Sequence, residues 1–108
     1  MSGEARDAVT RLCEAFKESA EYKEYKASRE EMDKDPGVAR KVDELRKRYF
    51  ALLQSGNEDG GLYYRQKELM EENKELLSLD QVERFYRAEV DYTWLVREVE
   101  QEFMRGIL

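Results

Sequence analysis

The last third of the chain carries one uninterrupted pattern that limits the fold more than any other feature. Its apolar-rich positions follow alternating steps of three and four residues: Val82, Phe85, Glu89, Tyr92, Val96, Val99 and Phe103. This spacing places side chains on one face of a helix, and no helix breaker appears before Gly106. We therefore predict a helix of about 26 residues, which is about 39 Å long at the usual rise per residue.

A helix of this length does not fit inside a small globule. The 108 residues predict one domain, over 1–108, and a compact domain of this size has a diameter of about 34 Å. We therefore expect an elongated helical bundle, or one that a second copy completes.

The opposite face of the same helix carries Val90 and Trp94. At about 100° per residue, Trp94 lies about 160° from Val96, nearly opposite the main apolar face. Three environments are open for its indole: another helix of the same chain, a subunit interface, or solvent. Our hypothesis is a homodimer with Val90 and Trp94 in its interface.

Start and stop signals divide the rest of the chain into further helices, expected over about 4–18, 20–34, 36–55 and 62–77. Ser19 is expected either to cap the second helix or to kink one long helix over 4–34. Asp35 followed by Pro36 is typical of a helix start. Ser78 with Gln81 predicts a capping box that opens the last helix.

One evident loop, "SGNEDGG", joins the third and fourth helices, and its glycines can take positive φ. Apolar and charged residues each make up 41% of the chain, which has only one proline. This composition is typical of amphipathic helices rather than of disorder. The expected fold class is therefore all-α, with four to five helices and a long C-terminal one.

The net charge of −6 disfavours a general binder of DNA or of anionic membranes, because both surfaces are negative. One basic cluster departs from this balance within "RKVDELRKR". It is either a solvated face or a contact for a partner protein, and an RNA-binding module is the competing function. Its candidate partner-binding residues are Arg40, Lys41, Arg46, Lys47 and Arg48.

No pattern of residues in the sequence predicts catalytic chemistry. There is no histidine and only one cysteine, Cys13, so a metal site of the usual ligands and an intrachain disulfide are not expected. We interpret the chain as a non-enzyme without a cofactor, in a reducing cytoplasm. Cys13 is expected to be a small core residue, with a reactive or ligating role as the alternative. No long apolar stretch predicts a signal peptide or a membrane span.

Glu89 is the one carboxylate within the predicted apolar face of the last helix. A buried carboxylate is costly unless it is paired or hydrogen-bonded. We expect a buried polar residue bonded to a tyrosine hydroxyl or an arginine. The alternative is contact with a partner or with a small ligand in a pocket.

Taken in order, these elements resemble the YlbF/YmcA family of small bacterial helical proteins. The family has a Ser-x-x-Tyr entry to its second helix, matched here by Ser19 and Tyr22, and a polar residue before its third, matched by Asp35. Its aromatic-apolar-x-Ala-Glu element is matched by Phe85, Tyr86, Ala88 and Glu89.

The resemblance implies an all-α fold, dimerisation and a regulatory rather than catalytic role. Well-known members are partners of the endoribonuclease RNase Y in mRNA processing and affect competence, sporulation and biofilm formation. Some bind an iron–sulfur cluster through cysteines near the C-terminus. This chain ends in "EFMRGIL", without a cysteine there, so the cluster is not carried over.

Overall fold

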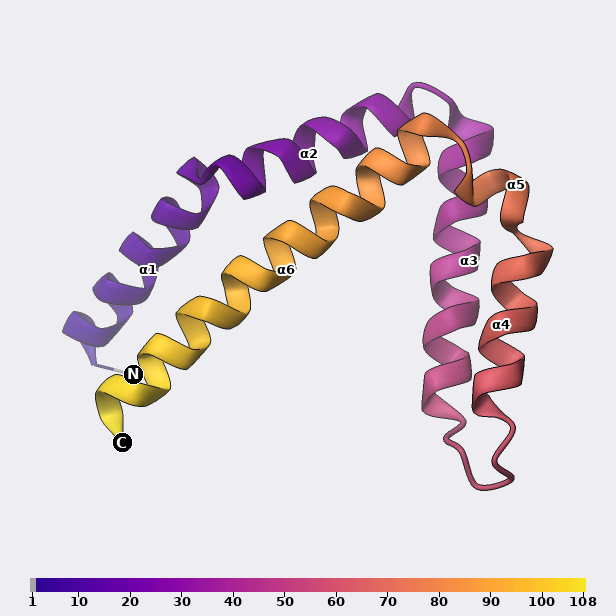
Figure 1. The fold of residues 1–108 in the computed structure, drawn as a ribbon. Helices are drawn as coiled ribbons and strands as arrows, with labels where there is room; N and C mark the ends of the chain where they lie inside the picture. Colours follow the sequence, from indigo (N-terminus) through magenta and orange to yellow (C-terminus); the bar gives the residue numbers. More distant parts are fainter. Residues whose placement is uncertain (1) are drawn as a thin grey trace. The chain divides into compact units, whose positions relative to one another are not determined.

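The computed structural model describes residues 2–108, and this part of the chain is all-α, as predicted. Its helices in chain order are α1 (Gly3–Glu18), α2 (Ala20–Asp33), α3 (Pro36–Gln54), α4 (Leu62–Glu72), α5 (Lys74–Leu77) and α6 (Asp80–Ile107) (Figure 1). The long C-terminal helix is confirmed, with 28 residues.

Contacts divide the chain into two compact units. The terminal unit comprises Met1–Arg29 and Phe85–Leu108, and the hairpin unit comprises Glu30–Arg84. Helices α2 and α6 each begin in one unit and end in the other. The single domain over 1–108 stays a prediction.

In the terminal unit, the first two helices are separate and meet at a single residue. Ser19 has an extended backbone, with φ −69° and ψ 149°. Its hydroxyl accepts from the backbone N–H of Tyr22 at 3.1 Å and donates to the carbonyl of Phe16 at 2.6 Å. One side chain thus satisfies a donor that begins α2 and a carbonyl that ends α1, which confirms the capping alternative.

Aromatic rings pack α2 against the first half of α6. Tyr92 lies at the centre, with its ring centroid 6.3 Å from that of Phe16, 5.8 Å from Tyr22 and 5.5 Å from Tyr25. Tyr25 also lies 5.5 Å from the ring of the fully buried Phe85. These tilted and edge-on contacts suit aromatic pairs, and the wide rings fill the space that smaller side chains would leave open.

Helix α1 receives little cover. None of its residues is buried, and Val9 and Leu12 are 47% and 44% exposed. Cys13 is exposed as well, so the prediction of a core cysteine is wrong. The apolar spacing on α1 is helical, but of its apolar side chains only Phe16, whose ring lies 6.3 Å from that of Tyr92, is partly covered.

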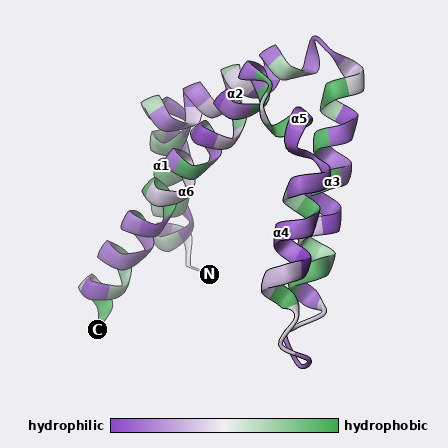
Figure 2. Cartoon of the chain, turned by 45° about the vertical axis from the view of Figure 1, so that its right-hand side comes forward, coloured by the Kyte–Doolittle hydropathy of each residue, from purple (hydrophilic) through white to green (hydrophobic). Residues whose placement is uncertain are grey.

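The hairpin unit has an aliphatic core between the antiparallel helices α3 and α4, which lie side by side in Figure 1. As predicted, Asp35 caps α3: its carboxylate accepts from the N–H of Val38 at 3.3 Å, and Pro36 takes the first helical position. The polar and apolar faces of the helices are visible in Figure 2. The buried apolar residues of this unit are Met32, Ala39, Val42, Leu45, Leu69 and Val82.

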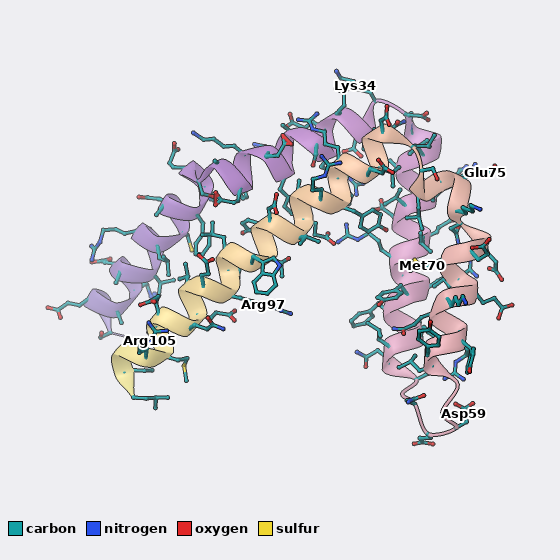
Figure 3. The ribbon with its side chains drawn as sticks, viewed as in Figure 1. Lys34, Asp59, Met70, Glu75, Arg97 and Arg105 are labelled. Atoms are coloured by element: carbon teal, nitrogen blue, oxygen red, sulfur yellow. The ribbon has the colours of Figure 1, made fainter. Side chains whose placement is uncertain are left out.

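The loop between α3 and α4 is held by polar contacts. Gly56 and Gly60 take positive φ, at 77° and 73°, as the glycine-rich sequence predicts. The Asp59 carboxylate, at the loop tip in Figure 3, accepts from the Gly61 N–H at 3.0 Å and from the Arg65 guanidinium at 3.0 Å. These two contacts, the N–H first, lower the pKa of Asp59.

The fourth helix expected over 62–77 is interrupted, and this prediction is corrected. Asn73 ends α4, and its side-chain amide donates to the Leu69 carbonyl at 2.8 Å. The capping box is also wrong. The Ser78 hydroxyl donates to the Lys74 carbonyl at 2.7 Å, and α6 begins later, at Asp80. A serine near a helix end can bond backward to a carbonyl as readily as forward to an N–H.

Candidate interaction surfaces

The outer face of α6 leaves its predicted interface residues exposed. Val90 is 52% exposed and Trp94 is 58% exposed. The guanidinium carbon of Arg97, labelled in Figure 3, lies 5.7 Å from the centre of the indole. Most of this indole is therefore not covered by its own chain. Of the three environments that the sequence left open, a subunit interface and solvent remain.

The exposed apolar surface continues along the distal part of the terminal unit. Phe103 is 62% exposed although it belongs to the periodic apolar face of α6. Val82 and Phe85, at the other end of the same face, are fully buried. The face is therefore closed near its start and open near its end. The other exposed apolar side chains at this end are Met104, Ile107 and Leu108.

A second apolar surface lies on the hairpin unit, as an open groove of about 690 Å³ between α3 and α4–α5. Across its floor, the Gln66 amide donates to the Tyr49 hydroxyl at 3.3 Å. Met70, labelled in Figure 3, and Tyr63 line it, with 36% and 65% of their surface exposed. We call it the hairpin groove; its lining residues are Tyr49, Tyr63, Gln66, Lys67, Met70, Glu71, Lys74, Leu77 and Ser78.

Sequence reasoning missed this groove because it followed only one stripe of the fourth helix. That stripe, which includes Leu62 and Leu69, packs toward α3, and Leu69 is buried. A neighbouring stripe, one residue later at each step, lines the groove. The available signal was the apolar spacing of seven residues between Tyr63, Met70 and Leu77, which the intervening lysines obscured.

The predicted basic cluster lies on α3. Arg40, Lys41, Lys47 and Arg48 are exposed, whereas Arg46 is half-buried. At about 100° per residue, the four exposed bases fall within an arc of about 120° that also contains Glu44, and Arg46 lies outside this arc. Arg48 forms an ion pair with Glu72 of α4 at 3.1 Å, and both side chains are more than half exposed, which limits the strength of this pair.

Glu89 lies on α6 in the terminal unit, one residue after the buried Ala88. Its side chain is partly exposed. The burial expected from its sequence position is therefore found only in part.

Residues 2–108 hold neither a cluster of metal ligands nor a membrane-spanning helix. No group of three or more histidine, cysteine or acidic side chains there is arranged to hold a metal ion. In the same range, no helix combines the length and the apolar character needed to cross a membrane.

Comparison with known proteins supports the resemblance noted in the sequence. The family model described as "Control of competence regulator ComK, YlbF/YmcA" matches residues 6–107. Comparisons with curated proteins and with solved structures found no match. Because the family match spans nearly the whole chain and the fold is all-α, the chain belongs to the YlbF/YmcA family of regulatory proteins.

Proposed function

We propose that this chain is a non-catalytic regulatory adaptor that acts as a homodimer and binds other proteins through its helix surfaces. The observation that carries the proposal is the exposed outer face of α6, where Val90 and Trp94 are both more than half exposed. A tryptophan on the far side of an already packed helix is stabilised when a second helix covers it.

The family description names control of the competence regulator ComK, which supports a role for this chain in gene regulation. The resemblance to the YlbF/YmcA family extends our proposal to RNase Y-linked mRNA processing and to control of competence, sporulation or biofilm formation. The cytoplasm as the site of action follows from the single cysteine and stays a prediction.

The competing function, RNA binding by α3, receives less support. A nucleic-acid surface needs clustered positive charge, whereas the exposed bases of α3 share their face with Glu44, and Arg48 is already paired with Glu72. Gel retardation at physiological salt separates the two functions. The adaptor proposal expects no tight complex of the isolated protein with RNA, and a tight complex would contradict it.

Sedimentation equilibrium tests the dimer. We expect twice the chain mass for the unaltered protein, and at least about a hundredfold weaker self-association for Trp94→Glu, because the substitution buries an unpaired charge in the interface. Phe50→Glu is the matched control, since Phe50 is 64% exposed but lies in the hairpin unit. A monomer at every accessible concentration, or equal loss in both variants, would contradict the proposal.

A further inference from the structure

Helices α4 and α5 carry a stripe of side chains that has no helix packed against it in the hairpin unit. Its members step by four, three, four and three residues, and all of them line the hairpin groove: Tyr63, Lys67, Met70, Lys74 and Leu77. The neighbouring stripe of α4, with the buried Leu69, already packs toward α3. A helix with two adjacent stripes normally lies between two neighbours, and here only one is present.

The spacing identifies the missing neighbour as a helix. Side chains repeating about every 3.5 residues form the holes into which the knobs of a crossing helix insert. Within the unbroken helix α4, Tyr63 to Met70 covers about 10 Å, or about two turns, and Lys74 and Leu77 continue the stripe on α5 after the break at Asn73. The Gln66–Tyr49 hydrogen bond of 3.3 Å joins the two walls of the groove, so its floor exists before a partner arrives.

The charges of the stripe indicate which side chains a partner helix should carry. Apolar Tyr63, Met70 and Leu77 alternate with Lys67 and Lys74, and both lysines are exposed. Lysines within such a stripe can keep their charged ends in water and pair with acids on the facing helix. Glu71 is the acid among the lining residues, so the groove wall has a positive balance on a chain whose net charge is −6.

From this arrangement we propose that the hairpin groove binds an acidic amphipathic helix of another protein. Its apolar side chains enter between Tyr63, Met70 and Leu77, and its carboxylates face Lys67 and Lys74. The inference rests on the proposed adaptor function and deepens it, because it gives the partner a chemical class. It also separates two surfaces: the outer face of α6 for self-association and the hairpin groove for the partner.

A second copy of the chain fits this groove less well. The uncovered face of α6 around Trp94 carries Arg87 and Arg97 together with Asp91 and Glu98. These four charges balance, so the face offers the two lysines no net attraction. Complementary charge is what distinguishes partners of similar apolar character.

A pair of synthetic helical peptides tests the charge preference. Both are four turns long with the same leucine stripe, and one carries glutamates beside the stripe where the other carries lysines. Fluorescence anisotropy at low salt should show the acidic peptide binding at least about tenfold more tightly, with the gap narrowing as salt screens the charges. Equal affinities, a preference for the basic peptide, or no binding of either would overturn the proposal.

Reversing the charges of the two groove lysines tests whether the preference for the acidic peptide comes from the groove. The double variant Lys67→Glu with Lys74→Glu should reverse it, so that the basic peptide binds more tightly. The matched control, Lys17→Glu with Lys26→Glu, changes the net charge equally but alters exposed residues of the terminal unit and should keep the acidic preference. A preference that is the same in both variants would overturn the assignment. All four sites are exposed, and circular dichroism verifies that both variants remain helical.

A second pair of variants identifies the occupant of the groove. Met70→Asp places a charge in the groove and should weaken the acidic peptide at least about tenfold, whereas Phe50→Asp, at a residue outside the lining and 64% exposed, should leave the affinity unchanged. The dimer mass should be equal in both. If Met70→Asp instead dissociates the dimer, a second copy occupies the groove and the proposal is overturned. An RNA oligonucleotide that displaces the acidic peptide from the groove would also overturn it.

The dimer proposal and the groove proposal can be contradicted independently of each other. If Trp94→Glu leaves the mass of the protein unchanged but the acidic peptide still binds the groove, the dimer interface is wrong and the groove assignment stands. If Trp94→Glu gives a monomer and the peptide does not bind, the dimer stands and the groove assignment is wrong.

Discussion

The hairpin unit and the terminal unit bury their apolar residues in different ways. In the hairpin unit, aliphatic side chains such as Val42 and Leu45 are almost completely removed from water. In the terminal unit, the rings around Tyr92 connect α2 to α6, while no residue of α1 is buried. The hairpin unit encloses an aliphatic core, whereas the apolar side chains of α1 and of distal α6 stay largely exposed.

This difference between the units shows that helical periodicity and burial are separate properties. Val9 and Leu12 have the spacing of a buried face, as Val42 and Leu45 do, yet they remain nearly half exposed. A periodic apolar face predicts that a helix packs against another apolar surface. It does not predict whether that surface belongs to the same chain. For α1 and distal α6, we propose that the covering surface belongs to a second copy.

The largest expected effect comes from one substitution made in each unit. Leu45→Ala removes a 2% exposed side chain and should lower the free energy of unfolding by about 2–5 kcal/mol through lost transfer energy and a cavity. Leu12→Ala, at a 44% exposed position, should cost under about 1 kcal/mol in dilute protein. Urea denaturation followed by circular dichroism measures both. Equal losses of unfolding free energy in the two variants would contradict the difference between the units.

A smaller effect is expected where the hairpin unit begins. Asp35→Ala removes the acceptor for the Val38 N–H and should cost about 1 kcal/mol in the free energy of unfolding. Asp35→Asn is the control, because its side-chain oxygen can still accept that bond. The same denaturation experiment distinguishes them. If both variants lose the same stability, the charge of Asp35 rather than its cap matters.

The smallest effect concerns the loop tip of the hairpin. The Gly61 N–H and then the Arg65 guanidinium hold the pKa of Asp59 below its ordinary 3.8. Because the folded pKa is lowered, the stability that Asp59 contributes is present above its ordinary pKa and is lost as pH falls through the folded value. In Arg65→Ala, an NMR titration should show the Asp59 midpoint moving up toward 3.8, without reaching it because the Gly61 bond remains. An unchanged midpoint would show that Arg65 has no part in the shift.

Much of the fold was predictable because it depends on local signals. The Asp35-Pro36 start, the glycines of the loop and the long period of α6 each act within a few residues. Helix ends decided by competing local bonds were not predictable. Ser78 could bond forward or backward, and its hydroxyl bonds backward to Lys74; Asn73 bonds to Leu69 and interrupts a stripe that continues on both sides.

The candidate surfaces were less predictable than the helices, for a different reason. The exposed Val90 and Trp94 could be placed on one face from helical phase alone. The hairpin groove needed the packing of α3 against α4, because Tyr49 and Gln66 meet only after the chain folds back. Glu89 lies on the expected face of α6, but its exposure depends on which residues cover that face.

The emission of Trp94 across a dilution series tests most directly whether a second copy covers the outer face of α6. The chain has a single tryptophan, so its fluorescence reports on this face alone. We predict a blue-shifted maximum at high protein concentration that moves to that of a solvent-exposed indole on dilution, over the range in which the sedimentation mass falls from dimer to monomer. The emission of an exposed indole at concentrations where the protein is fully dimeric would contradict the account.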